Sequence, residues 1–293
     1  MVGALAFRFD RRGRTVALEN LAAVFGDGMP ESEREAIARA SFANFARAML
    51  DLFWAQRLTP DTFHTWIRGE GFEELRQRLA REKRGAIFMS VHYGPWEWGS
   101  LAFGYLKLPA TVVVENFKNP RLTAIFRALR ERSGHTIIAQ ENSMLRMLKT
   151  VKRGGLTGLL IDLNLRPTQA ATAIKAFARE DGAGLMMCVP LLHAVLAVRA
   201  GALLVPAETR PMADGSCRII AHPPVEFPSD ASTAEIAQRC WDAFEPIIRA
   251  RPELWLWPYK FFRFRPQNAV RSYPGYANES RAFEKLLKSI NEN

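Results

Sequence analysis

The chain has 293 residues, of which 48% are hydrophobic and 24% are charged, as is usual for a globular protein with a sizeable core. Lysine and arginine number 40 against 30 acidic residues, and the net charge of +10 favours partners such as nucleic acid, anionic lipid or an acidic protein. The 3 cysteines are far apart and form no C-x-x-C pair, which argues against a disulfide scaffold or a structural zinc site and favours a reducing compartment.

The N-terminal part of the chain is predicted to be a helical cap over residues 1–82. Residues 1–9 are apolar, but this run is too short to cross a bilayer and lacks a signal-peptide cleavage pattern. Apolar residues recur at helical spacing in four further segments: 14–25, 32–54, 61–66 and 72–79. No stretch of the chain is both long and uncharged enough to span a bilayer, so any membrane contact of this chain is expected to be peripheral.

From residue 85 onward the sequence alternates between strand and helix patterns. Strands are expected over 86–91, 111–114, 136–138, 156–161, 202–207 and 218–221. Helices are expected over 121–132, 143–152, 184–199 and 232–249. This alternation predicts an α/β core over 83–265, with a mostly parallel, twisted sheet flanked by helices. The remaining residues, 266–293, are expected to form an irregular arm that ends in a helix.

The most informative segment reads G-A-I-F-M-S-V-H-Y-G-P-W-E-W-G at 85–99. The pattern predicts a buried strand before His92, a Gly-Pro turn, and a helix with Glu97 in its first turn. This places both side chains at the carboxyl edge of the sheet, where open α/β sheets bind ligands. A histidine held by a carboxylate can take a proton from a hydroxyl group. The alternative is a solvent-facing histidine and a glutamate that interacts with the helix dipole.

Several segments, in unbroken order over residues 14–265, resemble one family of enzymes. H-Y-G-P-W-E-W at 92–98 is similar to the His-x-x-x-x-Asp/Glu block of glycerolipid and lipid A acyltransferases, most of all the bacterial lauroyl and myristoyl acyltransferases of lipid A biosynthesis. Further similar segments are F-K-N-P-R-L at 117–122, A-L-R-E-R-S-G at 128–134, L-L-I-D-L-N at 159–164, A-V-R-A-G-A-L-L-V-P at 197–206 and P-E-L-W-L-W-P-Y-K at 252–260. The resemblance implies a glycerolipid acyltransferase-like fold that forms a single acyltransferase domain over 1–293.

The resemblance also implies roles for five residues. His92 would be the general base on an acceptor hydroxyl, and Glu97 would fix the imidazole tautomer. Arg130 and Arg132 would hold a lipid phosphate or stabilise the oxyanion, or else form the basic end of a helix. Asp162 would position an arginine or the substrate at the sheet edge, or else be a turn residue after a strand. No metal and no other cofactor is expected.

The function that the resemblance implies is transfer of a fatty acyl group from an acyl thioester to a hydroxyl of a lipid A-like glycolipid. The expected donor is acyl carrier protein or acyl-CoA, and an acidic carrier protein suits the net charge of +10. The expected location is peripheral, on the cytoplasmic face of the bacterial inner membrane. Relatives usually begin with a membrane-anchoring helix, which is absent or truncated in this sequence.

Two alternatives remain open at the level of sequence. Glu115 stands where relatives often carry an arginine, which favours another acceptor, such as a lysophospholipid, an aminolipid or an inositol-mannoside lipid. The other alternative is a non-catalytic lipid- or nucleic-acid-binding protein, although no nucleic-acid motif is present and nucleic acid is not an expected partner. The aromatic and basic residues over 254–264 fit either a lipid headgroup boundary or a buried strand with an exposed basic side.

Overall fold

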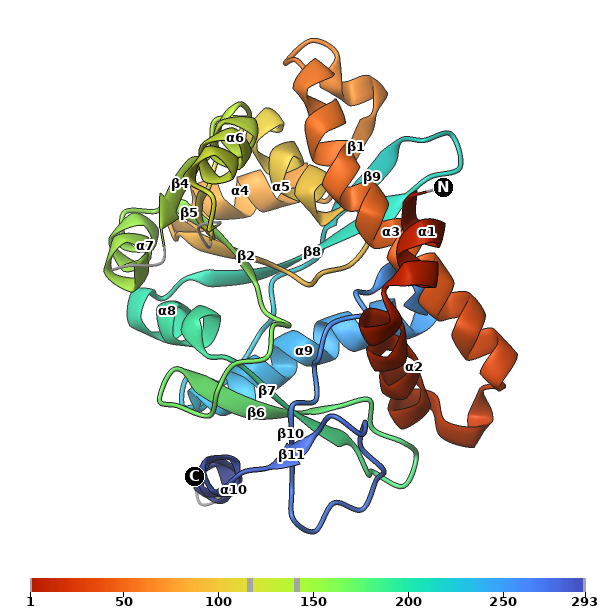
Figure 1. Ribbon diagram of the computed structural model, residues 1–293. Helices are drawn as coiled ribbons and strands as arrows, with labels where there is room; N and C mark the ends of the chain where they lie inside the picture. Colours follow the sequence, from red (N-terminus) through yellow and green to blue (C-terminus); the bar gives the residue numbers. More distant parts are fainter. Residues whose placement is uncertain (1, 115–117, 140–142, 292–293) are drawn as a thin grey trace. The chain divides into compact units, whose positions relative to one another are not determined.

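The computed structural model describes residues 2–114, 118–139 and 143–291 (Figure 1). The chain forms two compact units, each built from separate stretches of sequence. The first unit comprises Met1–Ala46, Ile161–Ala194 and Phe227–Asn293, and the second comprises Arg47–Leu160 and Val195–Glu226. The prediction of a single domain with a cap, a core and an arm remains a prediction.

The second unit contains a 7-stranded sheet in the order β1-β9-β8-β2-β5-β3-β4. Its strands are β1 (Ile67–Glu70), β2 (Ala86–Ser90), β3 (Thr111–Val114), β4 (Thr136–Ala139), β5 (Leu156–Leu160), β8 (Leu203–Pro211) and β9 (Cys217–Ala221). All neighbouring strands run parallel except β8 and β9, which are antiparallel. The predicted α/β class with a mostly parallel sheet is therefore confirmed.

Helices cover both faces of this sheet (Figure 1). They are α4 (Phe72–Glu82), α5 (Trp96–Tyr105), α6 (Pro120–Glu131) and α7 (Ser143–Lys152). Figure 1 shows α4, α5 and α6 on one face and α7 on the other, as right-handed crossovers between parallel strands require for this strand order. Phe72, Phe88 and Phe103 belong to the buried cluster between the sheet and the first group of helices. Burial of each such side chain contributes about 1.5–3 kcal/mol of hydrophobic stabilisation.

The first unit combines helices with an antiparallel hairpin. Its elements are α1 (Val2–Phe9), α2 (Arg11–Phe25), β6 (Ala171–Ala176), β7 (Leu185–Pro190), α9 (Thr233–Ala250), β10 (Phe264–Arg265), β11 (Asn278–Glu279) and α10 (Arg281–Asn291). Two more helices, α3 (Glu31–Trp54) and α8 (Leu192–Ala200), begin in the first unit and continue into the second. The N-terminal helical region is as predicted.

An aromatic cluster forms the core of the first unit. The rings of Phe177, Trp241, Trp255, Trp257 and Phe261 are buried and in mutual contact. The parallel rings of Trp255 and Phe261 stack with centroids 3.9 Å apart. Trp255, Trp257 and Phe261 are core residues, so a lipid headgroup boundary is the wrong interpretation for them. The alternative of a buried strand is correct in its burial but not in its secondary structure, because residues 256–263 form turns and loop.

Two parts of the strand pattern differ from the prediction. Residues 185–190 form β7 where a helix over 184–199 is expected, and its partner β6 is not expected at all. The run L-M-M-C-V at 185–189 is short and entirely apolar. In such a run, hydrophobic periodicity cannot distinguish a buried strand from a buried helix. β1 is also absent from the prediction, because Ile67 alone among its four residues is buried.

Among the described helices, none combines the length and the apolar character that crossing a membrane requires. The three cysteines, Cys188, Cys217 and Cys240, are free and buried. Burial raises the pKa of each thiol to about 12, so they act as small apolar core residues, as the sequence indicated.

Candidate functional site

The turn that carries His92 is built against strand β8. β2 ends at Ser90, and the backbone reverses through Gly94, whose φ is 56°, before α5 begins at Trp96. A Cβ atom at Gly94 would lie 2.4 Å from the carbonyl oxygen of Thr209, so no side chain fits there. The Thr209 hydroxyl donates to the carbonyl of Tyr93 at 2.7 Å. These contacts fix the position of His92 at the carboxyl edge of the sheet.

His92 itself is half-buried at the end of β2. Its ring meets that of Trp96 edge to face, with centroids 5.2 Å apart and an interplanar angle of 63°. Trp96 opens α5 and directly precedes Glu97, so the first turn of this helix lies beside the imidazole. The predicted placement of His92 at a strand end and Glu97 in a helix start is confirmed.

Glu97 is paired with Arg130 in a buried position. The Arg130 Nη2 atom lies 2.6 Å from Glu97 Oε1, and its Nε atom lies 3.0 Å from Oε2. The Arg130 side chain is only 15% exposed, and the Glu97 side chain is only 8% exposed. Two parallel charge-assisted hydrogen bonds of this kind fix both groups in orientation as well as in place. The guanidinium also lies over the ring of Phe126, 5.6 Å from its centroid.

The other two predicted residues have different surroundings. Arg132 lies just beyond α6, where its side chain is exposed to solvent. Asp162 follows β5 in the sequence and belongs to the first unit, where it is fully buried and accepts a hydrogen bond from Trp255 Nε1 at 2.9 Å. The structure thus brings Glu97 and Arg130 together, and the roles assigned to all five residues remain predictions. Glu115 lies outside the described residues.

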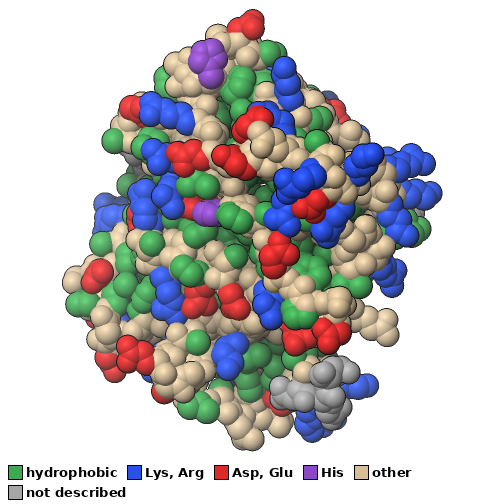
Figure 2. Space-filling model, turned by 180° about the vertical axis from the view of Figure 1, so that it is seen from behind, with side chains coloured by type: hydrophobic (Ala, Val, Ile, Leu, Met, Phe, Trp, Pro, Cys, Tyr) green, Lys and Arg blue, Asp and Glu red, His purple; other side chains and the backbone are tan. Residues whose placement is uncertain are grey.

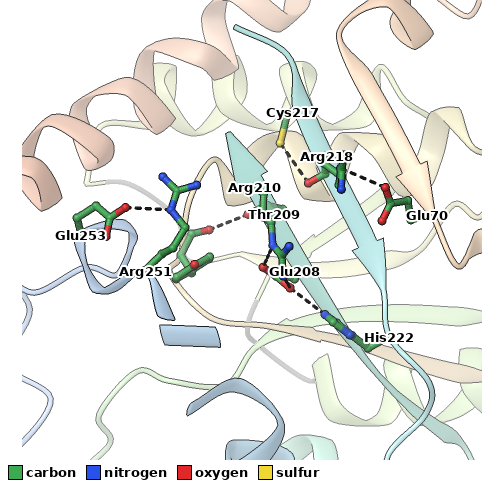
Figure 3. A network of polar contacts seen from close by, with 10 residues as sticks. Glu70, Glu208, Thr209, Arg210, Cys217, Arg218, His222, Arg251 and Glu253 are labelled. Atoms are coloured by element: carbon green, nitrogen blue, oxygen red, sulfur yellow. Dashed lines mark hydrogen bonds and ion pairs between the residues drawn. The ribbon is translucent and has the colours of Figure 1, made fainter. Parts of the chain in front are cut away.

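A second polar cluster at this sheet edge is not predicted by the sequence (Figure 3). The carboxylate of Glu208, on β8, is held between Arg210 and His222, with His222 Nε2 3.0 Å and Arg210 Nη2 3.1 Å from Oε2. Met89 on β2 pairs with Pro206 on β8, so Glu208, two residues further, lies at the same edge as His92. The only signal in the sequence is a glutamate that directly follows the strand predicted over 202–207.

Opposing effects act on the Glu208 carboxyl group. Burial alone would raise its pKa, but the hydrogen bonds from His222 and Arg210, together with their charge, outweigh burial and lower the pKa below 4.5. The side chain is 1% exposed. A buried carboxylate with two basic partners at the carboxyl edge is suited to a structural or positioning role beside the turn that carries His92.

Comparison with known proteins identifies the class to which this fold and site belong. The family model described as bacterial lipid A biosynthesis acyltransferase matches residues 1–264. The chain belongs to this family, and it is an acyltransferase, as the resemblance in the sequence implied.

Similar proteins include enzymes of two bacterial species. The chain is 26% identical over 280 residues to the lipid A biosynthesis lauroyltransferase of Escherichia coli (strain K12), covering 93% of this chain and 86% of that protein. It is 24% identical over 266 residues to the lipid A biosynthesis palmitoleoyltransferase of the same organism, covering 90% and 83%. The same figures hold for a lipid A biosynthesis acyltransferase of Shigella flexneri.

Proposed function

We propose that this acyltransferase moves a fatty acyl group from an acyl thioester on acyl carrier protein to a hydroxyl of a lipid A-like glycolipid. Family membership and the names of the similar enzymes support the acceptor class. The observation that carries the proposal is the arrangement at one sheet edge: His92 at the end of β2, beside a helix turn whose Glu97 is locked by Arg130.

In this mechanism His92 is the general base. It takes the proton of the acceptor hydroxyl while the oxygen attacks the thioester carbonyl and forms a tetrahedral intermediate. Collapse of the intermediate breaks the carbon–sulfur bond, and the imidazolium returns the proton to the leaving thiolate. The products are an ester and a free thiol. Because the thiolate is a good leaving group, the step that needs most help is activation of the hydroxyl.

The arginines and acids have supporting roles in the proposal. Glu97 orients the imidazole and stabilises its charged form, and Arg130 holds Glu97 in place. Arg132, exposed next to Arg130 at the end of α6, binds a phosphate of the acceptor. Asp162 positions an arginine or the substrate.

A peripheral location on the cytoplasmic face of the bacterial inner membrane is part of the same proposal. Four large apolar side chains of the second unit are unusually exposed: Leu50 (53%) and Phe53 (43%) on α3, with Leu122 (41%) and Ile125 (46%) on α6. The rings of Phe53 and Phe126 are in contact, 5.4 Å apart, which joins the two helices. An apolar surface of this kind next to Arg130 supports contact with lipid near the site.

The test is a panel of donors and acceptors offered to the full chain. Labelled acyl groups are supplied on acyl carrier protein or on coenzyme A, with a tetra-acylated lipid A precursor, a lysophospholipid or an aminolipid as acceptor. We expect the label, followed by mass spectrometry, in the lipid A precursor and with the carrier-protein donor. Label in a different lipid would show that the proposed acceptor is wrong. Equal rates of transfer from acyl-coenzyme A and from acyl carrier protein would show that the carrier protein is not the specific donor.

A further inference from the structure

The second unit has a cavity of about 460 Å³ at the edge of the sheet opposite to His92. Thr111 is the first residue of β3, Thr136 is the first of β4, and Gly155 directly precedes β5. All three line the cavity. Because these strands run parallel, their first residues share the amino edge, whereas His92 follows the carboxyl end of β2. The cavity is therefore distinct from the proposed catalytic site.

Helix α7 supplies the charged wall of this cavity. Arg146 and Lys149 line it from the helix, and Arg153 lines it from the turn that directly follows the end of the helix at Lys152. None of its lining residues is acidic. Within the described part of the chain, none of the three cations forms an ion pair with a carboxylate. Figure 2 shows lysine and arginine side chains gathered on its right-hand side, where α7 lies once Figure 1 is turned around.

The polar character of the wall points to an anion. The hydroxyl of Thr150 donates a hydrogen bond to the carbonyl of Arg146 at 3.1 Å. The hydroxyl donors that remain are those of Thr111 and Thr136, the first residues of β3 and β4. A Cβ atom at Gly155 would lie 2.8 Å from Thr150 Cγ2 and 2.9 Å from its carbonyl oxygen, so the turn between α7 and β5 requires a glycine at this point of the wall. The helix dipole favours cations near the end of α7, but it gives no reason for three of them to line one hollow.

We propose that this cavity binds the phosphate group of a phosphorylated molecule. Guanidinium groups bind phosphate oxygens through paired hydrogen bonds, while an ammonium and hydroxyls add single donors. A cavity of about 460 Å³ is in the size range of small-molecule sites. The phosphate belongs either to a soluble phosphate ester or to a phospholipid headgroup, and the two sources share the same recognition chemistry. The proposal does not depend on the acceptor or donor of acyl transfer.

The experiment measures binding of two probes to the full chain. Pyrophosphate binding is followed by isothermal titration calorimetry, and vesicles of phosphatidylglycerol are compared with vesicles of phosphatidylcholine by co-sedimentation. The cavity variants are Arg146→Gln, Lys149→Gln and Arg153→Gln. The control is Lys152→Gln, since Lys152 is exposed on the same helix and does not line the cavity. Thermal melting confirms that each variant is folded, and the three independent cavity variants keep the test valid if one of them is not.

We expect each folded cavity variant to weaken binding at least tenfold and Lys152→Gln to weaken it less than twofold. Binding of pyrophosphate with no preference for phosphatidylglycerol identifies a soluble phosphate ester. Cavity-dependent binding of phosphatidylglycerol vesicles identifies a lipid headgroup. The proposal is overturned if neither probe binds, or if Lys152→Gln weakens binding as much as the cavity variants do, because the effect would then come from the diffuse charge of α7.

Discussion

At the scale of single residues, the Glu97–Arg130 pair links the stability of the protein to its activity. Removing one partner of a buried ion pair leaves the other uncompensated, at a cost of about 3–5 kcal/mol. We therefore expect Arg130→Ala to lower the free energy of unfolding by this amount and to abolish transfer. Urea unfolding and an acyl-transfer assay measure the two effects.

A double variant separates the two effects of the pair. Glu97→Gln with Arg130→Met removes both charges, so we expect much of the lost stability to return while the enzyme stays inactive. Wild-type turnover in the stable double variant would show that the pair has no part in catalysis. An unchanged unfolding free energy in Arg130→Ala would show that the ion pair is not buried in solution.

The carboxylate of Glu208 gives a prediction on pH. Because its pKa is lower in the folded protein than the ordinary value of 4.5, its ionisation stabilises the fold above about pH 4.5, and this contribution is lost as the pH falls through the lowered pKa. Glu208→Gln should therefore be less stable than the wild type at pH 7. The difference should shrink as the pH falls below 4.5. Thermal unfolding from pH 7 to pH 3 measures it, and a constant difference would refute the assigned cause.

At the scale of elements, the turn between β2 and α5 depends on one glycine. Gly94 has a φ of 56° and no room for a Cβ atom against Thr209. Gly94→Ala should move the turn, displace His92 and lower kcat. The rest of the sheet should keep its stability. The control is Gly201→Ala, where φ is 61° and nothing lies within 4 Å of the position that the new Cβ atom would take.

The control variant carries only the backbone cost of a left-handed residue, about 1 kcal/mol. Its kcat should match that of the wild type within a factor of two. Crystal structures or kinetics that find Gly94→Ala and Gly201→Ala equivalent would mean that the contact with β8 does not position His92.

Elements with a clear local pattern are predictable from the sequence. The strand over 111–114 and the helix over 143–152 have the predicted bounds, because β-branched residues mark the first, and a serine start and a Gly-Gly end mark the second. The hairpin of β6 and β7 is not predictable in this way, since its stability comes from pairing between segments that have no distinctive period of their own.

The same distinction applies to the candidate site. The turn that places His92 after a strand end and Glu97 in the first turn of α5 is local, and its Gly-Pro signal is visible in the sequence. The pairing of Glu97 with Arg130 and of Glu208 with His222 depends on how separate strands and helices meet. Spacing along the chain contains no information on such contacts, so they are visible only in the folded structure.

At the scale of the whole molecule, the net charge of +10 gives a prediction on the proposed donor, an acidic acyl carrier protein. Long-range attraction speeds association and is screened by salt, with a Debye length of about 10 Å at 0.1 M. We expect kcat/KM with acyl carrier protein to fall about tenfold between roughly 0.02 and 0.5 M salt. A neutral acyl-pantetheine thioester serves as the control donor, and an equal salt effect on both donors would rule out attraction between the two proteins.

Proton removal by His92 at the carboxyl edge of the sheet is the central step of the proposed transfer. The most direct measurement is the acyl-transfer rate of His92→Ala, with Ser90→Ala as the matched control two residues earlier. The control loses the hydrogen bond from the Ser90 hydroxyl to the carbonyl of Ala207 at 2.9 Å and its longer contact with the carbonyl of Val91 at 3.4 Å, together worth about 1 kcal/mol. We predict a loss of about 10²–10⁴-fold in His92→Ala with a native melting profile, and near-normal transfer in Ser90→Ala. Transfer by folded His92→Ala at the rate of the control would show that His92 is not the general base.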